Sequence, residues 1–365
     1  MGRSKRIFSA GRLSLALFLI LLTVTTGFGQ RKIINLPNIP GYVTLKCDFH
    51  LHTVFSDGNV WPIMRIDEAV RDGLDAIAIT DHLGAAARKE FIPPDDNAAW
   101  KIGEKYAKEN NLILIHGTEI TGRTMPPGHF NALFIKDASL LPKENIWDSL
   151  QAAAQQGAFV QWNHPGWKVQ QPDGIPRMYD VHHQLIKSGY LHGIEFFNYM
   201  DYYPAVLDMC REHNLAIMGN SDNHTVISEV YPKPQNISRP MTLVMARERT
   251  LDSLKEALFA GRTLVWFRDI VAGKEEYAKP FFYQCISVGK PYFQNARSVL
   301  FEVTNVCDIP FKLVDGPSKA PSSITLGANS ATRIVLGKNV PMPLAYAVKN
   351  VLTGEKDVLQ IQLKP

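Results

Sequence analysis

Cysteine is scarce in this sequence, and no CxxC pair is present, which argues against a zinc–thiolate site. The four cysteines are Cys47, Cys210, Cys285 and Cys307. Cys285 and Cys307 both fall in the C-terminal region and are the most plausible disulfide, whereas Cys47 and Cys210 are expected to be buried free thiols. Internal repeats and low-complexity tracts are also missing, so the 365 residues are expected to form one large domain and a small one.

The sequence also lacks a block of basic residues, so no nucleic-acid-binding surface is expected. The formal net charge of +4 is no evidence for one, because Arg3, Lys5, Arg6 and Arg12 near the N-terminus account for all of it. The rest of the chain is therefore close to neutral.

Long apolar runs are missing except over residues 13–26, LSLALFLILLTVTT. Basic residues precede this run and the small residues Gly27 and Gly29 follow it, which predicts a cleavable signal peptide over residues 1–29. The run is short for a membrane span, although an uncleaved anchor is the alternative. We expect a periplasmic or secreted protein that has no membrane span once the signal is removed.

The pattern over residues 30–270 predicts a large α/β domain. Short apolar strands, beginning with VTLKCDFHLH at 43–52, alternate with amphipathic helices such as PIMRIDEAVRDG at 62–73. This alternation predicts parallel strands with helices outside, as a (β/α) barrel or an open sheet. Residues 275–365 instead show short alternating runs without a long helical period, which predicts a small all-β, sandwich-like domain.

Polar residues stand where the predicted strands end, at the edge of an α/β fold that builds active sites. In the first strand, Asp48, His50 and His52 would face one side, and Phe49 and Leu51 the other. A metal ion would satisfy the two buried histidines, and Asp48 could orient one of them from behind. His182, His183, His192 and His213 have no such context and are expected at the surface or at helix ends.

Several spaced motifs together resemble the PHP (polymerase and histidinol phosphatase) superfamily: HLHTVFSDG, ITDH, GTEI, GHFNALF, NHPGW and SDNH. The resemblance covers residues 44–267 and implies a distorted (β/α)7 barrel, two or three divalent metal ions and hydrolysis of phosphate esters. Asp57 stands where some relatives carry a histidine one residue later. The metal ligands implied by these motifs are His50, His52, Asp57, His82, Glu119, His129, His164, Asp222 and His224.

The ligand types themselves suit Mn, Zn or Fe. Two such ions about 3.5–4 Å apart can clamp a phosphoryl group and hold a hydroxide, with Glu119 as the bridge and Asp222 in a catalytic role. Arg123 is the predicted cation for the phosphoryl charge, with Lys168 as a second. The remaining predicted contacts are Trp167 as a wall of the pocket, and Glu195 and Asn198 as groups behind the ligands or near the substrate.

The leading hypothesis is an exported phosphodiesterase that attacks a small phosphate diester with a metal-bound hydroxide. A phosphomonoesterase of the histidinol-phosphatase kind is the first alternative, and an amidohydrolase-like metal hydrolase is the second. A third is a metal- or glycan-binding envelope protein without catalytic activity. Nothing in the sequence predicts an oligomeric state.

Overall fold

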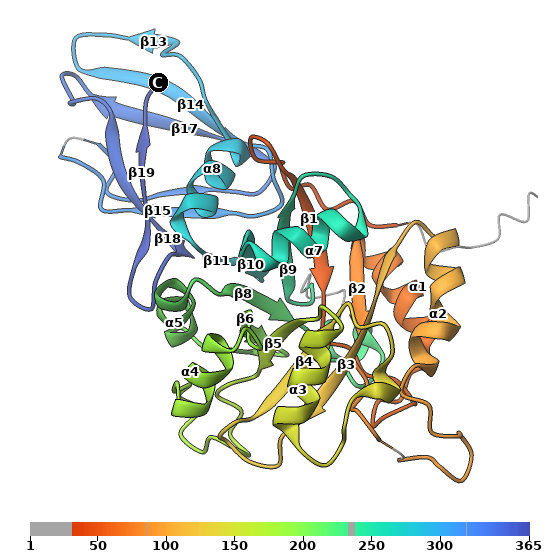
Figure 1. Cartoon of the computed structure of the whole chain (residues 1–365). Helices are drawn as coiled ribbons and strands as arrows, with labels where there is room; N and C mark the ends of the chain where they lie inside the picture. Colours follow the sequence, from red (N-terminus) through yellow and green to blue (C-terminus); the bar gives the residue numbers. More distant parts are fainter. Residues whose placement is uncertain (1–30, 86, 233–237, 319) are drawn as a thin grey trace, which may run out of the picture.

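The computed structural model describes residues 31–85, 87–232, 238–318 and 320–365, so the predicted signal peptide lies outside the described residues. The larger domain is a barrel coated by helices, and a β domain stands beside it (Figure 1). The prediction of an α/β barrel with an added β domain is therefore confirmed. The barrel strands are β1 (Val43–Asp48), β2 (Ala76–Ile79), β3 (Ile113–Thr121), β4 (His129–Leu133), β5 (Phe159–Asn163), β6 (Gly193–Asn198), β8 (Ala216–Asn220), β9 (Met241–Ala246) and β10 (Thr263–Phe267).

The directions of these strands explain the distorted sevenfold pattern. Strands β1, β2, β3, β5, β6, β8 and β10 all run the same way, whereas β4 and β9 are antiparallel to their neighbours. The first strand is shorter than predicted, because the ladder stops at Asp48 and the histidines follow it. Beyond Asp48, Leu51 forms an isolated parallel bridge with Asn223.

The outer helices follow from amphipathic patterns and defined ends. In α1 (Pro62–Asp72), Pro62 stands in the first turn, and Gly73 ends the helix at a φ of +85°, which glycine adopts without strain. The other helices of this domain are α2 (Ala98–Glu109), α3 (Ile146–Gln155), α4 (Asp180–Lys187), α5 (Ala205–His213), α6 (Ile227–Val230) and α7 (Leu251–Phe259), with a short 3₁₀ turn at Ala138–Leu140.

A seam closes the barrel where β8 meets β9 and β10. Across the described residues, no backbone ladder joins β8 to either strand, although its other edge pairs with β6. Two threonine hydroxyls span the gap instead. Thr242 Oγ1 accepts from the N–H of Gly219 and donates to the carbonyl of that residue, and Thr263 Oγ1 accepts from the N–H of Ile217.

The C-terminal domain consists of two packed sheets. One contains β12 (Ile286–Val288), β13 (Phe293–Gln294), β14 (Ser298–Asn305) and β17 (Ser330–Gly337). The other contains β15 (Phe311–Val314), β16 (Ile324–Leu326), β18 (Leu344–Leu352) and β19 (Val358–Leu363), and it continues into the barrel sheet because β18 pairs with β11 (Ile270–Gly273).

A helix leads into this domain where none was predicted. Helix α8 (Glu275–Cys285) includes the FFYQC segment that the alternation suggested as a strand. Phe281, Phe282 and Cys285 have the spacing of one helix face and are buried in a cluster that also includes Ile77 of β2 and Phe301 of β14. The two domains therefore share one hydrophobic core.

The predicted disulfide is not formed, because Cys285 and Cys307 are both free and buried, as are Cys47 and Cys210. Cys285 ends α8, and its carbonyl accepts from the N–H of Val306, so the two cysteine segments lie side by side. Among the residues described, no helix combines the length and apolar character needed to cross a membrane.

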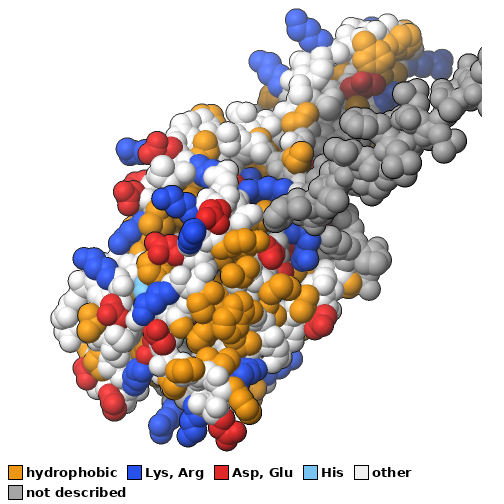
Figure 2. Space-filling view, turned by 90° about the vertical axis from the view of Figure 1, so that its right-hand side faces the viewer, with side chains coloured by type: hydrophobic (Ala, Val, Ile, Leu, Met, Phe, Trp, Pro, Cys, Tyr) orange, Lys and Arg blue, Asp and Glu red, His pale blue; other side chains and the backbone are white. Residues whose placement is uncertain are grey.

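The outer face of the barrel is polar in most places but not everywhere. Figure 2 shows the side that carries α1 and α2, where apolar side chains gather among scattered charged ones. Trp61, just before α1, and Met64 within it are 44% and 45% exposed. The start of α1 thus presents apolar side chains to solvent.

Candidate active site

The predicted ligands converge at one edge of the barrel. His50, His52 and His82 follow β1 and β2, Glu119 lies near the end of β3, and His164 directly follows β5. Asp222 and His224 come after β8 in the same way. His129 is the first residue of β4, and because β4 is antiparallel its start lies at the edge where the neighbouring strands end.

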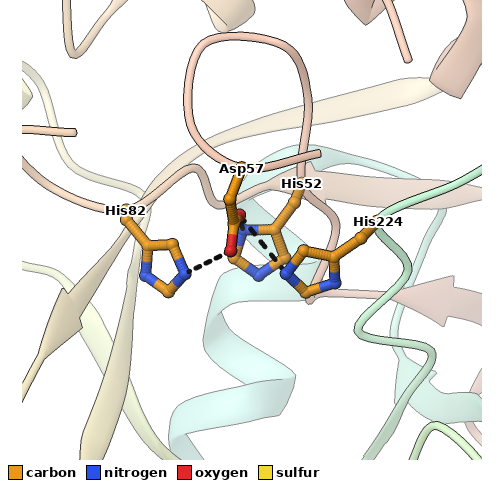
Figure 3. A group of neighbouring side chains, drawn as sticks. All are labelled: His52, Asp57, His82 and His224. Atoms are coloured by element: carbon orange, nitrogen blue, oxygen red, sulfur yellow. Dashed lines mark ion pairs between the residues drawn. The ribbon is translucent and has the colours of Figure 1, made fainter. Parts of the chain in front are cut away.

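In one group of four side chains, three histidines surround Asp57 (Figure 3). Its carboxylate oxygens lie 3.5 Å from Nε2 of His82, 3.3 Å from Nε2 of His224 and 3.6 Å from Nδ1 of His52. The rings of His52 and His224 stack with centroids 4.1 Å apart. Three imidazoles and a carboxylate facing one point have the composition of a transition-metal site.

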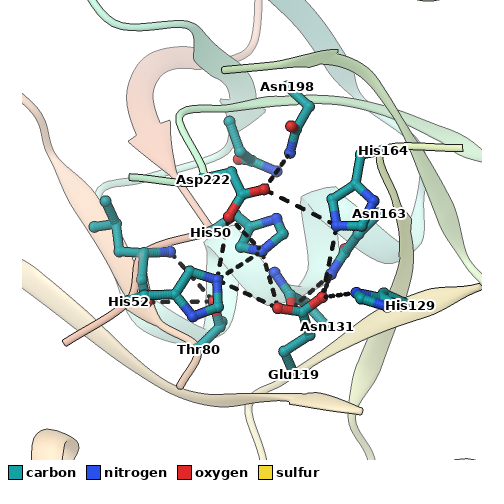
Figure 4. A network of polar contacts seen from close by, with 12 residues as sticks. His50, His52, Thr80, Glu119, His129, Asn131, Asn163, His164, Asn198 and Asp222 are labelled. Atoms are coloured by element: carbon teal, nitrogen blue, oxygen red, sulfur yellow. Dashed lines mark hydrogen bonds and ion pairs between the residues drawn. The ribbon is translucent and has the colours of Figure 1, made fainter. Parts of the chain in front are cut away.

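Glu119 is the centre of the second group (Figure 4). Its Oε2 lies 3.2 Å from Nε2 of His50 and 3.3 Å from both Nε2 of His52 and Nδ1 of His82. Its Oε1 lies 2.9 Å from Nδ1 of His129 and 3.7 Å from Nε2 of His164. One buried carboxylate thus faces five imidazoles and touches every group of possible ligands, which is the position that a bridging ligand needs.

Asp222 completes the floor of the site. Its Oδ1 lies 3.2 Å from Nε2 of His50 and 3.1 Å from Nε2 of His52, and those two nitrogens are 3.1 Å apart. This buried oxygen accepts no hydrogen bond within the described chain. An unsatisfied carboxylate oxygen beside converging imidazole nitrogens fits a divalent cation, which would supply the missing partner.

Charges within the cluster shift its protonation strongly. Burial opposes the charged form of Glu119, but the charges of His82 and His50 prevail and hold its pKa well below the ordinary value. Burial would likewise lower the pKa of His82, but Glu119 and Asp57 raise it to about 9. Without a metal, protons on the histidines therefore balance the carboxylates, and a metal ion would replace them.

Glu195 holds the site from below, as the sequence predicted for a group behind the ligands. His50 Nδ1 lies 2.9 Å from its Oε1, and the backbone N–H of His164 donates to its Oε2 at 2.7 Å. Asn198 donates to the same carboxylate and lies 3.2 Å from Asp222. With Nδ1–H of His50 engaged, its Nε2 is left to face the site.

Asp48 lies behind the histidines and acts on the backbone rather than on an imidazole. Its carboxylate accepts from the backbone N–H of His50 at 3.4 Å and from the N–H and the hydroxyl of Ser221, and it pairs with buried Arg239 at 3.2 Å. The reason is its position: Asp48 is the last residue of β1, while the histidines lie beyond the strand. Asp48 therefore fixes the residue that precedes Asp222.

Two further residues, neither of them a predicted ligand, organise the loops. The guanidinium of Arg65, on α1, is fully buried and donates to the carbonyls of His52, Asn223 and Thr225. Asp81, from the ITDH motif, accepts from the N–H and hydroxyl of Thr53 and from Ser56, beside Asp57. Arg65 shares the buried face of α1 with apolar residues, but its partners are backbone carbonyls, which no sequence pattern marks.

Backbone strain is concentrated at the same edge. His164 and Asp222 have φ angles of +28° and +47°, in a region that residues other than glycine rarely adopt. The N–H of His164 donates to Glu195 and the N–H of Ser221 donates to Asp48, and these hydrogen bonds hold the two conformations. Such strain is typical of sites whose geometry is fixed for function.

A cavity of about 390 Å³ opens above the cluster. None of the described residues that line it is lysine or arginine, so the predicted cations Arg123 and Lys168 are not part of its wall. Arg123 is exposed in a loop that is closed by a hydrogen bond from the N–H of Gly122 to the carbonyl of Gly128. The lining residues are His52, Asp57, His82, Glu119, His129, His164, Trp167, Asn198, Tyr199, Asp201, Tyr203, Asp222, Asn223, His224, Thr225 and Val230.

Trp167 does form part of that wall, as predicted, beside His129 and His164 with ring centroids 5.6 and 5.4 Å away. His182, expected near the surface, is instead buried. It stacks on Trp162 and lies 2.8 Å from the carbonyl of Pro127, in the segment leading to His129.

Comparisons with known proteins agree with this arrangement. The family model described as an Ig-like domain matches residues 286–364. The chain is similar to a two-domain protein of Bacteroides vulgatus containing a predicted PHP-like metal-dependent phosphoesterase, at 37% identity and a TM-score of 0.87, over 92% of this chain and 98% of that one.

Two other matches are more limited. An uncharacterized protein of Methanocaldococcus jannaschii is 39% identical over 77 residues, which is 21% of this chain and 34% of that protein, so the match spans about a third of the relative. A lesion-specific endonuclease of Pyrococcus furiosus is 17% identical over 64% of this chain and 59% of its own, with a TM-score of 0.40, too low to bear on fold or function.

Proposed function

The chain belongs to the PHP superfamily, and from that premise we propose that it is a metal-dependent phosphoesterase that hydrolyses small phosphate diesters. The observation that carries the proposal is the cluster around Glu119. It contains three groups of possible ligand atoms, and within each group all the atoms lie within 4.8 Å of one another. When bound, divalent ions there would neutralise phosphoryl charge and lower the pKa of water to about 7.

The residues of the chain have distinct parts in this proposal. His52, Asp57, His82 and His224 would hold one ion, and His50, Glu119 and His164 would hold another. Asp222 lies 3.2 Å from Nε2 of His50 and 3.1 Å from Nε2 of His52 and would stand between the two groups. His129 supports Glu119 through the contact between its Nδ1 and Oε1. Glu195 keeps the proton of His50 on Nδ1, so that Nε2 presents its lone pair to the site.

The charge of the cavity supports a diester rather than a monoester. A monoester carries nearly two negative charges at neutral pH, and a diester carries one. Among the described lining residues, no lysine or arginine offsets that charge, whereas Asp201 adds a negative one. Each additional negative charge on the substrate therefore weakens binding unless bound metal ions offset it.

The test compares bis(p-nitrophenyl) phosphate with p-nitrophenyl phosphate, using purified protein loaded in turn with Mn, Zn or Fe. We expect a higher kcat/KM for the diester with at least one metal. Faster hydrolysis of the monoester would replace the diesterase assignment with the phosphomonoesterase alternative. Hydrolysis of a lactone or an amide with both phosphate esters untouched would favour the amidohydrolase alternative.

We further propose that residues 1–29 direct export and are then removed. The basic start and the apolar run at 13–26 support this proposal. N-terminal sequencing of protein recovered from the periplasmic fraction should begin at Gln30. Recovery of the chain with Met1 in the cytoplasmic fraction would contradict it.

A further inference from the structure

A small hairpin stands at the rim of the cavity, and it begins at Asn198, which donates to Asp222. It pairs the end of β6 with β7 (Asp201–Tyr202), and its two-residue loop is Tyr199 and Met200. Tyr199 and Asp201 both line the cavity. Residues of this kind, beside the reaction centre but not in it, contact the parts of a substrate that do not react.

Tyr199 occupies a position for which its side chain is poorly suited. Its φ is +53°, and the first loop residue of a tight two-residue hairpin favours glycine because glycine adopts positive φ without strain. A bulky aromatic residue there destabilises the turn. The carbonyl of Tyr199 accepts from the hydroxyl of Tyr231, but that bond involves only the backbone of Tyr199 and would be available to glycine.

The ring of Tyr199 packs edge-on against the ring of Tyr231, with centroids 6.4 Å apart, but the residue is still 44% exposed. Trp167, which is 38% exposed, lines the same cavity. Exposed aromatic rings around a polar reaction centre bind flat or ring-shaped groups through their faces. Ligand binding therefore accounts for a tyrosine in this strained turn better than stability of the fold does.

Asp201 adds a charge preference. It is exposed, and none of the described residues forms an ion pair with it at the rim. The lining residues include no lysine or arginine, as far as the structure describes them. A second phosphate on the substrate would be repelled here, whereas an uncharged ring would not.

We propose that Tyr199, Trp167 and Asp201 form a specificity rim that selects phosphodiesters whose organic group is an uncharged ring, such as a nucleoside or an aryl group, over those that carry a further phosphate. This inference rests on the proposed phosphodiesterase function and deepens it. Tyr199 and Trp167 bind the ring, and Asp201 excludes the additional charge.

The first test replaces Tyr199 with glycine and uses thymidine 5′-(p-nitrophenyl phosphate) as substrate. For Tyr199→Gly we expect KM to rise about tenfold, with kcat nearly unchanged and a midpoint of thermal unfolding equal to or above that of the unaltered protein. Tyr202→Leu is the control, because Tyr202 belongs to the same hairpin but does not line the cavity. A lowered unfolding midpoint with unchanged KM would assign Tyr199 a purely structural role and overturn the inference.

The second test compares the same nucleoside substrate with its 3′-phosphorylated form, and both release p-nitrophenolate. For Asp201→Lys we expect the preference for the uncharged nucleoside to fall at least about fivefold, mainly through KM. Glu104→Lys makes the same change of charge at an exposed position on α2. An equal effect of both variants would overturn the charge preference alone, whereas failure of the unaltered protein to hydrolyse any diester would overturn the proposed function and this inference together.

Discussion

The barrel mouth and the C-terminal β domain use buried positions in opposite ways. At the mouth, Asp48, Glu119 and Glu195 are at most 1% exposed, and each is surrounded by hydrogen-bond donors or imidazoles. In the β domain, strands such as β14 and β19 alternate buried apolar and exposed side chains. Buried positions at the mouth therefore hold charged groups in place, whereas those of the β domain are filled by apolar side chains. Both regions nevertheless contribute residues to one shared hydrophobic core.

The largest effect should come from removing charge at the centre of the mouth. For Glu119→Gln we expect at least about a 100-fold loss of kcat/KM, because five imidazoles lose their carboxylate partner. Metal content measured by plasma emission should fall with it. The matched control is Glu302→Gln on the exposed face of β14, which should change neither. Full activity in Glu119→Gln would remove the central role of this carboxylate.

A core change in the β domain should instead affect stability throughout the chain. Phe301 is fully buried in the core that also includes barrel residues, and Phe301→Ala should cost about 3–5 kcal/mol of unfolding free energy. Because the core is continuous, we expect barrel and β domain to unfold together at a lower denaturant midpoint, with kcat retained below it. Val335→Ala, at a position 48% exposed, is the control. Separate unfolding of the β domain with an unchanged barrel transition would show that the shared core does not couple the two.

A smaller effect is expected from acid, which should act on the barrel through its histidines, because every histidine of the sequence precedes the β domain. Burial lowers the pKa of His182 to about 4. Below a pH of about 6.5 the histidine of the unfolded chain binds a proton, whereas buried His182 stays neutral until the pH approaches 4. The folded state is therefore progressively destabilised as the pH falls from about 6.5 toward 4. For His182→Gln we therefore expect a flatter dependence of unfolding free energy on pH over this window, by up to about 3 kcal/mol.

Chemical denaturation at several pH values would measure this effect. The adjacent His183 is exposed, and His183→Gln should reproduce the pH dependence of the unaltered protein. The same slope in His182→Gln as in the unaltered protein would contradict the assignment of this acid sensitivity to His182.

Most of the predicted ligands lie close together in the structure because they stand at or just after the end of a strand, where chain order and fold geometry coincide. The strand pattern likewise predicted the barrel and the β domain. It did not predict α8, because the FFYQC segment suits both a strand and a helix, and only packing on the shared core selects the helix. Arg123 was wrongly predicted to reach the substrate because it lies close to Glu119 in the sequence, which does not reveal that its loop turns away from the cavity. Arg65 was missed because its partners are backbone carbonyls, which no motif records.

The threonine seam makes the barrel a rolled ribbon rather than a uniform ring. Elsewhere around its circumference, the wall is joined by ladders of backbone hydrogen bonds, but along the body of β8 the bonds to β9 and β10 are those of two hydroxyls. At the mouth the same seam is fastened again, because the N–H of His52 donates to the carbonyl of Asn223 and Ser221 donates to Asp48. Asp222 is the second residue after β8 and lies between these two fastenings, so the position of this carboxylate depends on how the barrel is closed.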